Sequence, residues 1–310
     1  MIKTFNIFTK ITVFFLIVCL IFILSFSSDY SVAVLDGIKL WGAYVLPALF
    51  PYFFLTAILS RLSITSKLSI ICSPLTKRLF RINGTAGYLF FISILSGYPT
   101  GAKSVADAYT GGLLSKTEAE RASALCSTSS PAFLISCVGN ITFRSRAFGI
   151  ILFLCHLISA IIIGFIFSFY KREELPSKNV RLIKTSQDDI LYQSVYNSVI
   201  SILVVGGIIV LCYLFCQILF SFIDINGVAR AIISGFIECT GGLKLLASTG
   251  HRLALPIAGA ICGFGGLSII FQSLAFLKKA KIKTAPFFIS KALSAVLNFT
   301  LCLVCSKIFL

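Results

Sequence analysis

Lysines and carboxylates stand beside glycine motifs within two apolar segments of this chain. The first motif is S-G-Y-P-T-G-A-K at residues 96–103, and Asp107 follows it. The second is E-C-T-G-G-L-K at residues 238–244. Within a membrane, irregular backbone is tolerated where protein buries it or where it lines a cavity, and an ionisable group there suggests a functional site. The two motifs therefore predict a polar site at membrane depth.

The charged residues of the two motifs are candidate ligands of a substrate. Lys103 and Asp107 are four residues apart, which places them on one face of a helix. They form either a self-neutralising pair that eases membrane insertion or one wall of a substrate cavity. In the cavity interpretation, Tyr98 and Thr100 supply hydrogen-bonding hydroxyls, and Glu238 and Lys244 have the matching roles in the second motif.

Two later apolar segments contain breaks of their own. The sequence C-S-T-S-S-P at residues 126–131 places hydroxyls and a proline inside one predicted span, and G-F-G-G-L-S at residues 263–268 places three glycines inside another. Unwound helix centres expose the N-terminal ends of half-helices, which attract anions. The glycines also suit close helix packing, which is the alternative. The candidate ligands in these breaks are Ser127, Ser129, Ser130, Gly265 and Ser268.

The composition is that of a polytopic membrane protein. Of 310 residues, 57% are hydrophobic and 12% are charged, and the mean hydropathy is +0.98. The net charge of +16 comes from short basic clusters between apolar runs, so we expect no nucleic-acid partner. Most of the eleven cysteines lie in apolar spans, and C-x-x-C at residues 302–305 has no second pair, so we expect no metal and no cofactor.

Other single residues receive simpler interpretations. His156 lies alone on an apolar helix and is interpreted as a core histidine. Lys291 is predicted to extend its ammonium to the membrane interface. The sequence shows no catalytic triad, H-E-x-x-H motif or phosphate-binding loop, so we expect no enzymatic activity.

The apolar segments predict the transmembrane elements. Residues 11–28 read as a retained first helix, with a signal peptide as the alternative. The other crossings are predicted at residues 41–60, 122–143, 147–170, 190–223, 253–277 and 286–306, with re-entrant helical hairpins at 86–114 and 228–248. The basic stretch at 61–81 is predicted to be a cytoplasmic loop.

The order of these elements predicts an all-α fold with an inverted repeat. Each half contains three crossings and one hairpin, so the two halves face opposite ways across the membrane. The predicted units are an N-terminal helix (1–30), a first repeat (31–170), a cytoplasmic linker (171–189) and a second, inverted repeat (190–310). The N-terminus is placed in the cytoplasm, which leaves most Lys and Arg residues on that side.

Several segments together resemble one family. They are LSGYPTGAK, residues 114–139 with the run KTEAER, GFIECTGGLKLLAS, GFGGLS and KTAPFFISKAL. They are similar to the YlbJ family of sporulation integral membrane proteins, which carry the nucleoside-recognition or Gate domain. The resemblance implies an architecture like the concentrative nucleoside carriers, with two hairpins and two unwound helices around a site at the membrane midplane.

The resemblance also implies a role in endospore formation, in the mother-cell-derived membrane around the forespore. We expect a transporter or channel-like protein that moves a small anionic solute, with dipicolinate suggested by analogy. A non-transporting membrane protein of spore envelope assembly and a nucleoside transporter are the alternatives. The expected partners are the lipid bilayer and the solute; other sporulation membrane proteins and a second copy of the chain are left open.

Overall fold

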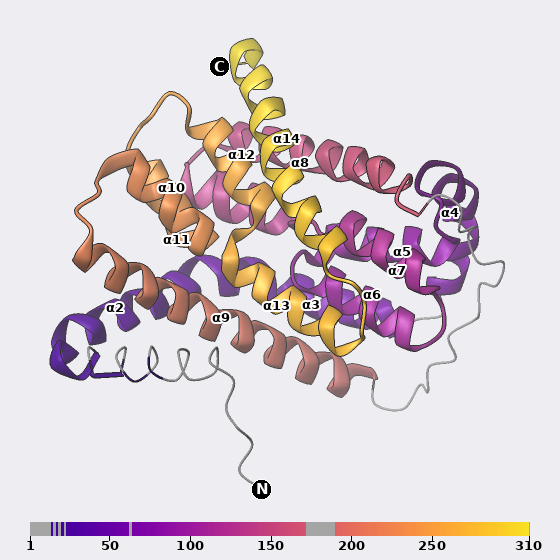
Figure 1. Ribbon diagram of the computed structural model, residues 1–310, viewed down its shortest axis with the longest axis horizontal. Coiled ribbons are helices and arrows are strands. Elements are labelled where there is room, and N and C mark those ends of the chain that lie inside the picture. The colour runs from indigo at the N-terminus through magenta and orange to yellow at the C-terminus, as the bar shows by residue number, and fades with distance from the viewer. Residues whose placement is uncertain are drawn as a thin grey trace, which may run out of the picture.

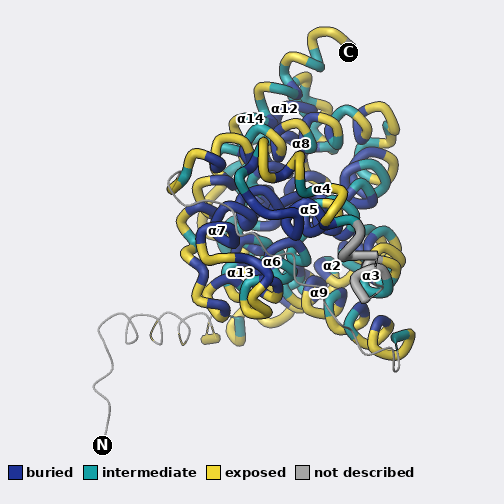
Figure 2. Tube along the Cα trace, turned by 90° about the vertical axis from the view of Figure 1, so that its right-hand side faces the viewer, coloured by how far each residue is buried: buried dark blue, intermediate teal, exposed yellow. Residues whose placement is uncertain are grey.

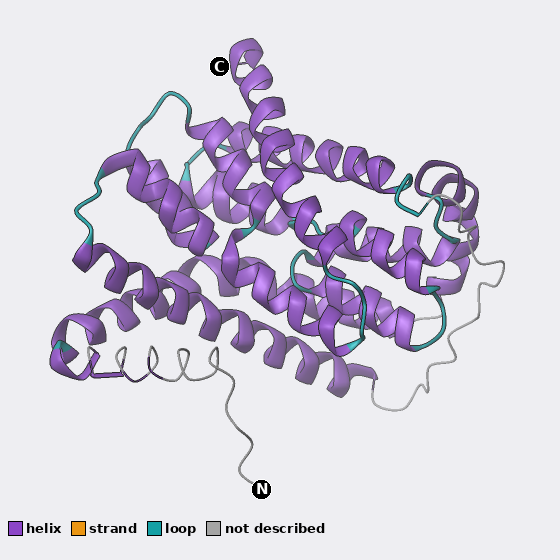
Figure 3. Cartoon of the chain, viewed as in Figure 1, coloured by secondary structure: helices purple, strands orange, loops and turns teal. Residues whose placement is uncertain are grey.

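All regular secondary structure in the part of the chain that the structure describes is helical. The computed structural model describes residues 14, 17, 20–21, 23–61, 64–171 and 190–309 (Figure 1; Figure 3). Its elements are α2 (Ser27–Leu40), η1 (Trp41–Val45), α3 (Leu46–Arg61), α4 (Ile64–Phe80), α5 (Gly84–Ser96), α6 (Thr100–Thr110), α7 (Lys116–Leu125), η2 (Ala132–Thr142), α8 (Arg146–Phe167), α9 (Ile190–Phe222), α10 (Gly227–Ile237), α11 (Cys239–Ser248), α12 (Ala254–Phe264), α13 (Gly266–Lys279) and α14 (Ala285–Phe309).

Five helical segments in these ranges are long and apolar enough to cross a membrane. They are Tyr30–Leu55, Arg146–Phe167, Ile190–Phe222, Ala254–Lys279 and Ala285–Ile308. A sixth candidate is the pair Leu68–Phe80 and Gly84–Ser96, which bends by 96° at a short break. The predicted crossings at 147–170, 190–223, 253–277 and 286–306 are thus confirmed as apolar helices.

Both predicted hairpins are found as two helices separated by a break. In the first hairpin, α5 ends at Gly97, whose φ of 72° is readily adopted by glycine, and α6 begins at Thr100. In the second, α10 and α11 pack closely on each other and Glu238 forms the break between them. A methyl group added at Gly242 would lie 2.1 Å from the Cα atom of Gly235, so the two arms require glycine at this approach.

Both predicted unwound centres are also present. Residues 127–130 have no helical structure between α7 and η2, and Gly265 breaks the chain between α12 and α13. Gly265 and Gly266 have φ angles of 86° and 79°, which non-glycine residues adopt only under strain.

Three boundaries differ from the sequence-based prediction. The predicted cytoplasmic loop at 61–81 contains the helix α4, which packs on α5. The predicted boundary at residue 30 falls inside α2. The predicted crossing at 122–143 is not one apolar helix. The non-helical residues 127–130 divide it into the end of the polar helix α7, which starts at Lys116, and the shorter apolar helix η2. The predicted linker at 171–189 lies outside the described residues except for Lys171, and 8 of the 18 residues of the predicted helix at 11–28 also lie outside them.

The run KTEAER explains why the polar helix α7 is buried. Glu118 closes a capping box with Ser115 and also accepts a hydrogen bond from the backbone N–H of Asn83, at 2.9 Å. Arg121, which was expected in a cytoplasmic loop, is 1% exposed and donates hydrogen bonds to the carbonyls of Arg81, Tyr170 and Lys171. These bonds hold the starts of α5 and α7 against the end of α8.

Burial separates an interior of mixed polarity from an apolar exterior. Figure 2 shows the fully buried residues gathered at the centre of the molecule and the exposed ones around it. Large apolar side chains such as Phe165, Leu203 and Val296 are exposed on α8, α9 and α14. Such faces suit contact with lipid. Helices α5, α7, α8 and α12 each contribute eight or more buried residues.

Candidate functional site

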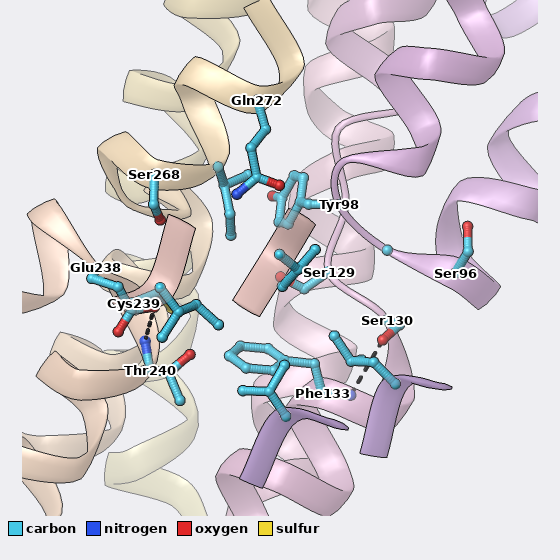
Figure 4. Close-up of a pocket in the computed structure, with 16 residues that line it drawn as sticks. Ser96, Tyr98, Ser129, Ser130, Phe133, Glu238, Cys239, Thr240, Ser268 and Gln272 are labelled. Atoms are coloured by element: carbon cyan, nitrogen blue, oxygen red, sulfur yellow. Dashed lines mark hydrogen bonds between the residues drawn. The ribbon is translucent and has the colours of Figure 1, made fainter. Parts of the chain in front are cut away.

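A small cavity lies where the four breaks meet. Figure 4 shows Tyr98, Ser129 and Ser130 on one side of it and Glu238, Thr240 and Ser268 on the other. The cavity is lined by Val45, Leu49, Ser96, Gly97, Tyr98, Ser129, Ser130, Phe133, Val205, Ile209, Glu238, Cys239, Thr240, Ser268, Ile269 and Gln272. Its wall is therefore formed by both hairpin breaks, both broken helices, and apolar residues of η1, α3 and α9.

The first hairpin break is joined to the break after α7. The side-chain oxygens of Ser93 and Thr128 are 2.6 Å apart, and the hydroxyl of Tyr98 donates to the carbonyl of Ser127 at 3.0 Å. A methyl group added at Gly97 would lie 2.8 Å from the backbone nitrogen of Ser130. This close approach explains why glycine is needed there, and it fixes the position of Tyr98.

A histidine supports the same break from α8. His156 is 2% exposed, and its Nε2 atom accepts a hydrogen bond from the backbone N–H of Ser129 at 2.9 Å. In a continuous helix the N–H of Ser129 would bond a backbone carbonyl, and here the imidazole of His156 accepts this bond instead. Because Nε2 is the acceptor, a neutral His156 carries its proton on Nδ1. The interpretation of His156 as a core histidine is confirmed, and its partner is part of the site.

The second hairpin break has a carboxylate at its centre. Glu238 is 3% exposed and accepts hydrogen bonds from the backbone N–H groups of Thr240 and Gly241, at 2.9 and 2.6 Å. A methyl group added at Gly266 would lie 3.2 Å from the backbone nitrogen of Cys239. The hairpin break and the helix break of the second half are therefore neighbours, as they are in the first half.

Lys291, on α14, is the buried lysine beside this site. It is 0% exposed, its Nζ atom donates to the hydroxyl of Tyr98, and it lies 4.1 Å from the centroid of the Tyr98 ring. A methyl group added at Gly265 would lie 3.6 Å from Nζ, which places the ammonium near the C-terminal end of α12. The ion pairs found among the described residues involve other lysines, Lys39 and Lys171. The prediction that Lys291 reaches the membrane interface is wrong.

Five of the predicted site residues line the cavity, namely Tyr98, Ser129, Ser130, Glu238 and Ser268. Ser127 and Gly265 do not line it. The carbonyl of Ser127 accepts a hydrogen bond from Tyr98, and Gly265 lies beside the Nζ atom of Lys291.

The other four predicted residues, Thr100, Lys103, Asp107 and Lys244, are not among the residues that line the cavity. Asp107 and Lys244 are exposed, and Lys244 lies over the ring of Tyr44, 5.4 Å from its centroid.

Sequence reasoning missed the contributions of Lys291, Gln272 and Thr240. Lys291 stands in a strongly apolar helix. The argument applied to Lys103, that an ionisable group inside a membrane segment suggests a functional site, would also have selected Lys291. Gln272 lies four residues after Ser268 and therefore on the same face of α13, a signal that was available. The apolar wall from α3 and α9 carried no signal, because these residues resemble any core position.

These features define a class of protein: an integral membrane protein built from helices, several of them broken around a polar cavity. Among curated proteins, the chain is 27% identical over 300 residues to the sporulation integral membrane protein YlbJ of Bacillus subtilis (strain 168). The match covers 84% of this chain and 73% of that relative, and it supports the YlbJ family, to which the motifs pointed. No family model matches the chain, and no solved structure matches it.

Proposed function

We propose that this protein moves a small anionic solute across a membrane during endospore formation. The observation that carries the proposal is the cavity between the two pairs of breaks, together with the buried ammonium of Lys291. This ammonium lies behind the wall and donates to the hydroxyl of Tyr98, which lines the cavity. Burying a charge is costly unless it is paired, so a cation kept inside an apolar protein requires a reason. Attraction of an anion into the cavity supplies one. The proposal includes no catalytic step.

The surroundings of the cavity favour a solute that is partly apolar and carries oxygen atoms. Hydroxyls of Ser129, Ser130 and Ser268 face an apolar wall that includes Phe133 and Val205. A flat aromatic ring with carboxylate groups fits this combination, because ring faces pack on apolar side chains and carboxylates accept hydrogen bonds. Dipicolinate, an aromatic dianion, is therefore the solute that we propose to test first.

The cavity has to open for such a solute to pass. It offers about 50 Å³ to water-sized spheres, and one water needs about 10–15 Å³ by this measure, so it has room for a few waters. A movement of one hairpin against its neighbouring helix break would enlarge it, as expected for alternating access around a fixed site. We place this activity in the mother-cell-derived membrane around the forespore. The similarity to a sporulation integral membrane protein supports a membrane role in sporulation.

Solute uptake by purified protein in liposomes tests the proposal. Labelled dipicolinate is compared with labelled nucleosides, and empty liposomes measure leakage. The proposal predicts uptake of dipicolinate well above leakage and uptake of nucleosides at the leakage level. Uptake of nucleosides alone would favour a nucleoside carrier, and no uptake of either solute by folded protein would favour a non-transporting role in spore assembly.

A further inference from the structure

A second cavity approaches the central one from the side of α9 and α10. It offers about 190 Å³ by the same measure. Its lining includes Arg230, Ser234, Glu238 and Gly241. Glu238 lines both cavities, and it stands at the break between α10 and α11.

The carboxylate of Glu238 occupies the wall between the two cavities. The N–H group that bonds its Oε1 atom belongs to Thr240, which lines the central cavity. The N–H group that bonds its Oε2 atom belongs to Gly241, which lines the second cavity. A solute that passes between the cavities at this point must therefore displace the carboxylate from one or both N–H groups.

The site at the start of α11 binds a carboxylate in this structure, namely that of Glu238. Two backbone N–H groups, aided by the positive end of a helix of ten residues, hold it at 2.9 and 2.6 Å. No ion pair within 4.0 Å joins Glu238 to a cation among the described residues. The same donors would suit a carboxylate that comes from a solute.

Two further features indicate that a ligand visits this region. Gln272 lines the central cavity at 7% exposure, and its Oε1 atom has no hydrogen-bond partner among the residues that the structure describes (Figure 4). A buried amide without a partner is normally satisfied by water or by a ligand. On the other side of Glu238, the Arg230 guanidinium lies 4.5 Å from the centroid of the Phe220 ring and lines the second cavity. It places a positive charge in the larger cavity.

We propose that the N–H groups of Thr240 and Gly241 form a carboxylate-binding site that the side chain of Glu238 fills in this structure. A carboxylate of the solute replaces that of Glu238 on these N–H groups as the solute moves between the two cavities. The inference rests on the proposed function, because it assumes an anionic solute. It assigns to Glu238 the role of a gate, and to Arg230 that of the first cation the solute meets.

Hydrogen exchange of the backbone tests this assignment directly. In Glu238→Ala, the N–H groups of Thr240 and Gly241 lose their acceptor, so hydrogen exchange in the segment 239–242 should become faster than in the unmodified protein. Adding pyridine-2,6-dicarboxylate to the variant should slow it again. The matched control is Glu118→Ala, which removes a carboxylate that likewise caps a helix, at the start of α7, and does not line the cavity. Exchange at Asn83 and Ser115, whose N–H groups donate to this carboxylate, should rise, and the dicarboxylate should not reduce it.

A second variant keeps the helix cap but weakens the competition between residue 238 and the solute carboxylate for the N–H groups of Thr240 and Gly241. Glu238→Gln retains an oxygen that can accept a hydrogen bond, but without charge, and charge-assisted bonds are about twice as strong as neutral ones. The purified variant should bind pyridine-2,6-dicarboxylate about tenfold more tightly than the unmodified protein. Binding that is unchanged or weaker in folded Glu238→Gln, or no protection of residues 239–242 in Glu238→Ala, would overturn the gate.

These outcomes separate the gate from the proposed function. Uptake of dipicolinate by the unmodified protein together with unprotected residues 239–242 would remove the gate and keep the transport. Protection of residues 239–242 without uptake by the unmodified protein would keep the carboxylate site and remove the transport.

Discussion

The ammonium of Lys291 lies 4.1 Å from the ring centroid of Tyr98, although the two residues are 193 positions apart in the chain. The hydroxyl of Tyr98 accepts a hydrogen bond from Lys291 and donates one to the carbonyl of Ser127. One phenol therefore joins three parts of the fold, which are α14, the first hairpin break and the break after α7. A residue in this position can couple movement of the hairpin to the charge beside the cavity.

The first prediction concerns this phenol. Tyr98→Phe keeps the ring under the ammonium but removes both hydrogen bonds of the hydroxyl, and it leaves the Ser127 carbonyl without this donor. We expect a loss of stability of about 1–3 kcal/mol and slower solute uptake. Thermal unfolding in detergent and liposome uptake measure the two effects. Tyr109→Phe, on the same hairpin, is the control and should change neither; equal effects of both substitutions would contradict this role.

The second prediction concerns the buried arginine of α7. Arg121→Met removes the hydrogen bonds that the guanidinium donates to the carbonyls of Arg81, Tyr170 and Lys171. Because bonds to a charged group contribute about 1.5–3 kcal/mol each, the variant should lose at least about 3 kcal/mol of stability. The unfolding temperature and the yield of folded protein report it. Arg146→Met, at an exposed position on α8, should unfold like the original; a similar loss there would contradict the account.

The third prediction concerns the packing of the second hairpin. Gly242→Ala places a methyl group 2.1 Å from the Cα atom of Gly235, so α10 and α11 must separate. We expect severe destabilisation, seen as loss of folded protein in size-exclusion chromatography. Gly207→Ala is the matched control, since a methyl group there would lie within 4 Å of no other described residue, apart from its chain neighbours and the backbone of its own helix. It should be neutral or stabilising by up to about 1 kcal/mol. A well-folded Gly242→Ala protein would show that the arms are not in close contact.

The broken helices could be predicted because glycine, proline and runs of hydroxyl residues are unusual inside apolar segments. The breaks at Gly97, at residues 127–130 and at Gly265 all lie where these residues predicted them. Helix α4 was missed for the opposite reason. Its lysines and arginines are typical of a loop at the membrane surface when the sequence is considered alone. The structure shows that the segment is a helix that packs on α5.

The sequence predicted only those residues of the site that belong to the helix breaks. Sequence reasoning located the hydroxyls and Glu238, because they belong to the breaks themselves. It favoured Lys103 and Lys244 over Lys291, because the first two stand beside glycine motifs. Lys291 faces the interior because α14 packs against α12 and α8. These helices are far apart in sequence, so a local sequence pattern does not predict their packing.

The fourth prediction concerns the orientation of the two halves, which stays a prediction. Three of the candidate spans follow residue 184, so a reporter fused after Lys184 and one fused after Leu310 should lie on opposite sides of the membrane. Alkaline phosphatase and green fluorescent protein fusions distinguish the two sides. Both reporters on one side would exclude the inverted repeat.

The last prediction concerns the charge beside the cavity. Lys291→Met removes a buried ammonium, and replacing a buried charge by an apolar side chain of similar length is often neutral or stabilising. The variant should therefore fold. Lys103→Met and Lys244→Met provide the comparison. None of the three lysines lines the cavity, but Lys291 donates to the hydroxyl of Tyr98 in the cavity wall, whereas only the sequence motifs had favoured Lys103 and Lys244.

The most direct measurement is the initial rate of dipicolinate uptake into liposomes that contain equal amounts of each folded variant. If the anion is drawn into the cavity by Lys291, uptake by Lys291→Met should fall at least about tenfold, equivalent to about 1.4 kcal/mol. Uptake by Lys103→Met and Lys244→Met should stay close to that of the unmodified protein. Normal uptake by folded Lys291→Met would contradict the proposal that this lysine attracts the solute.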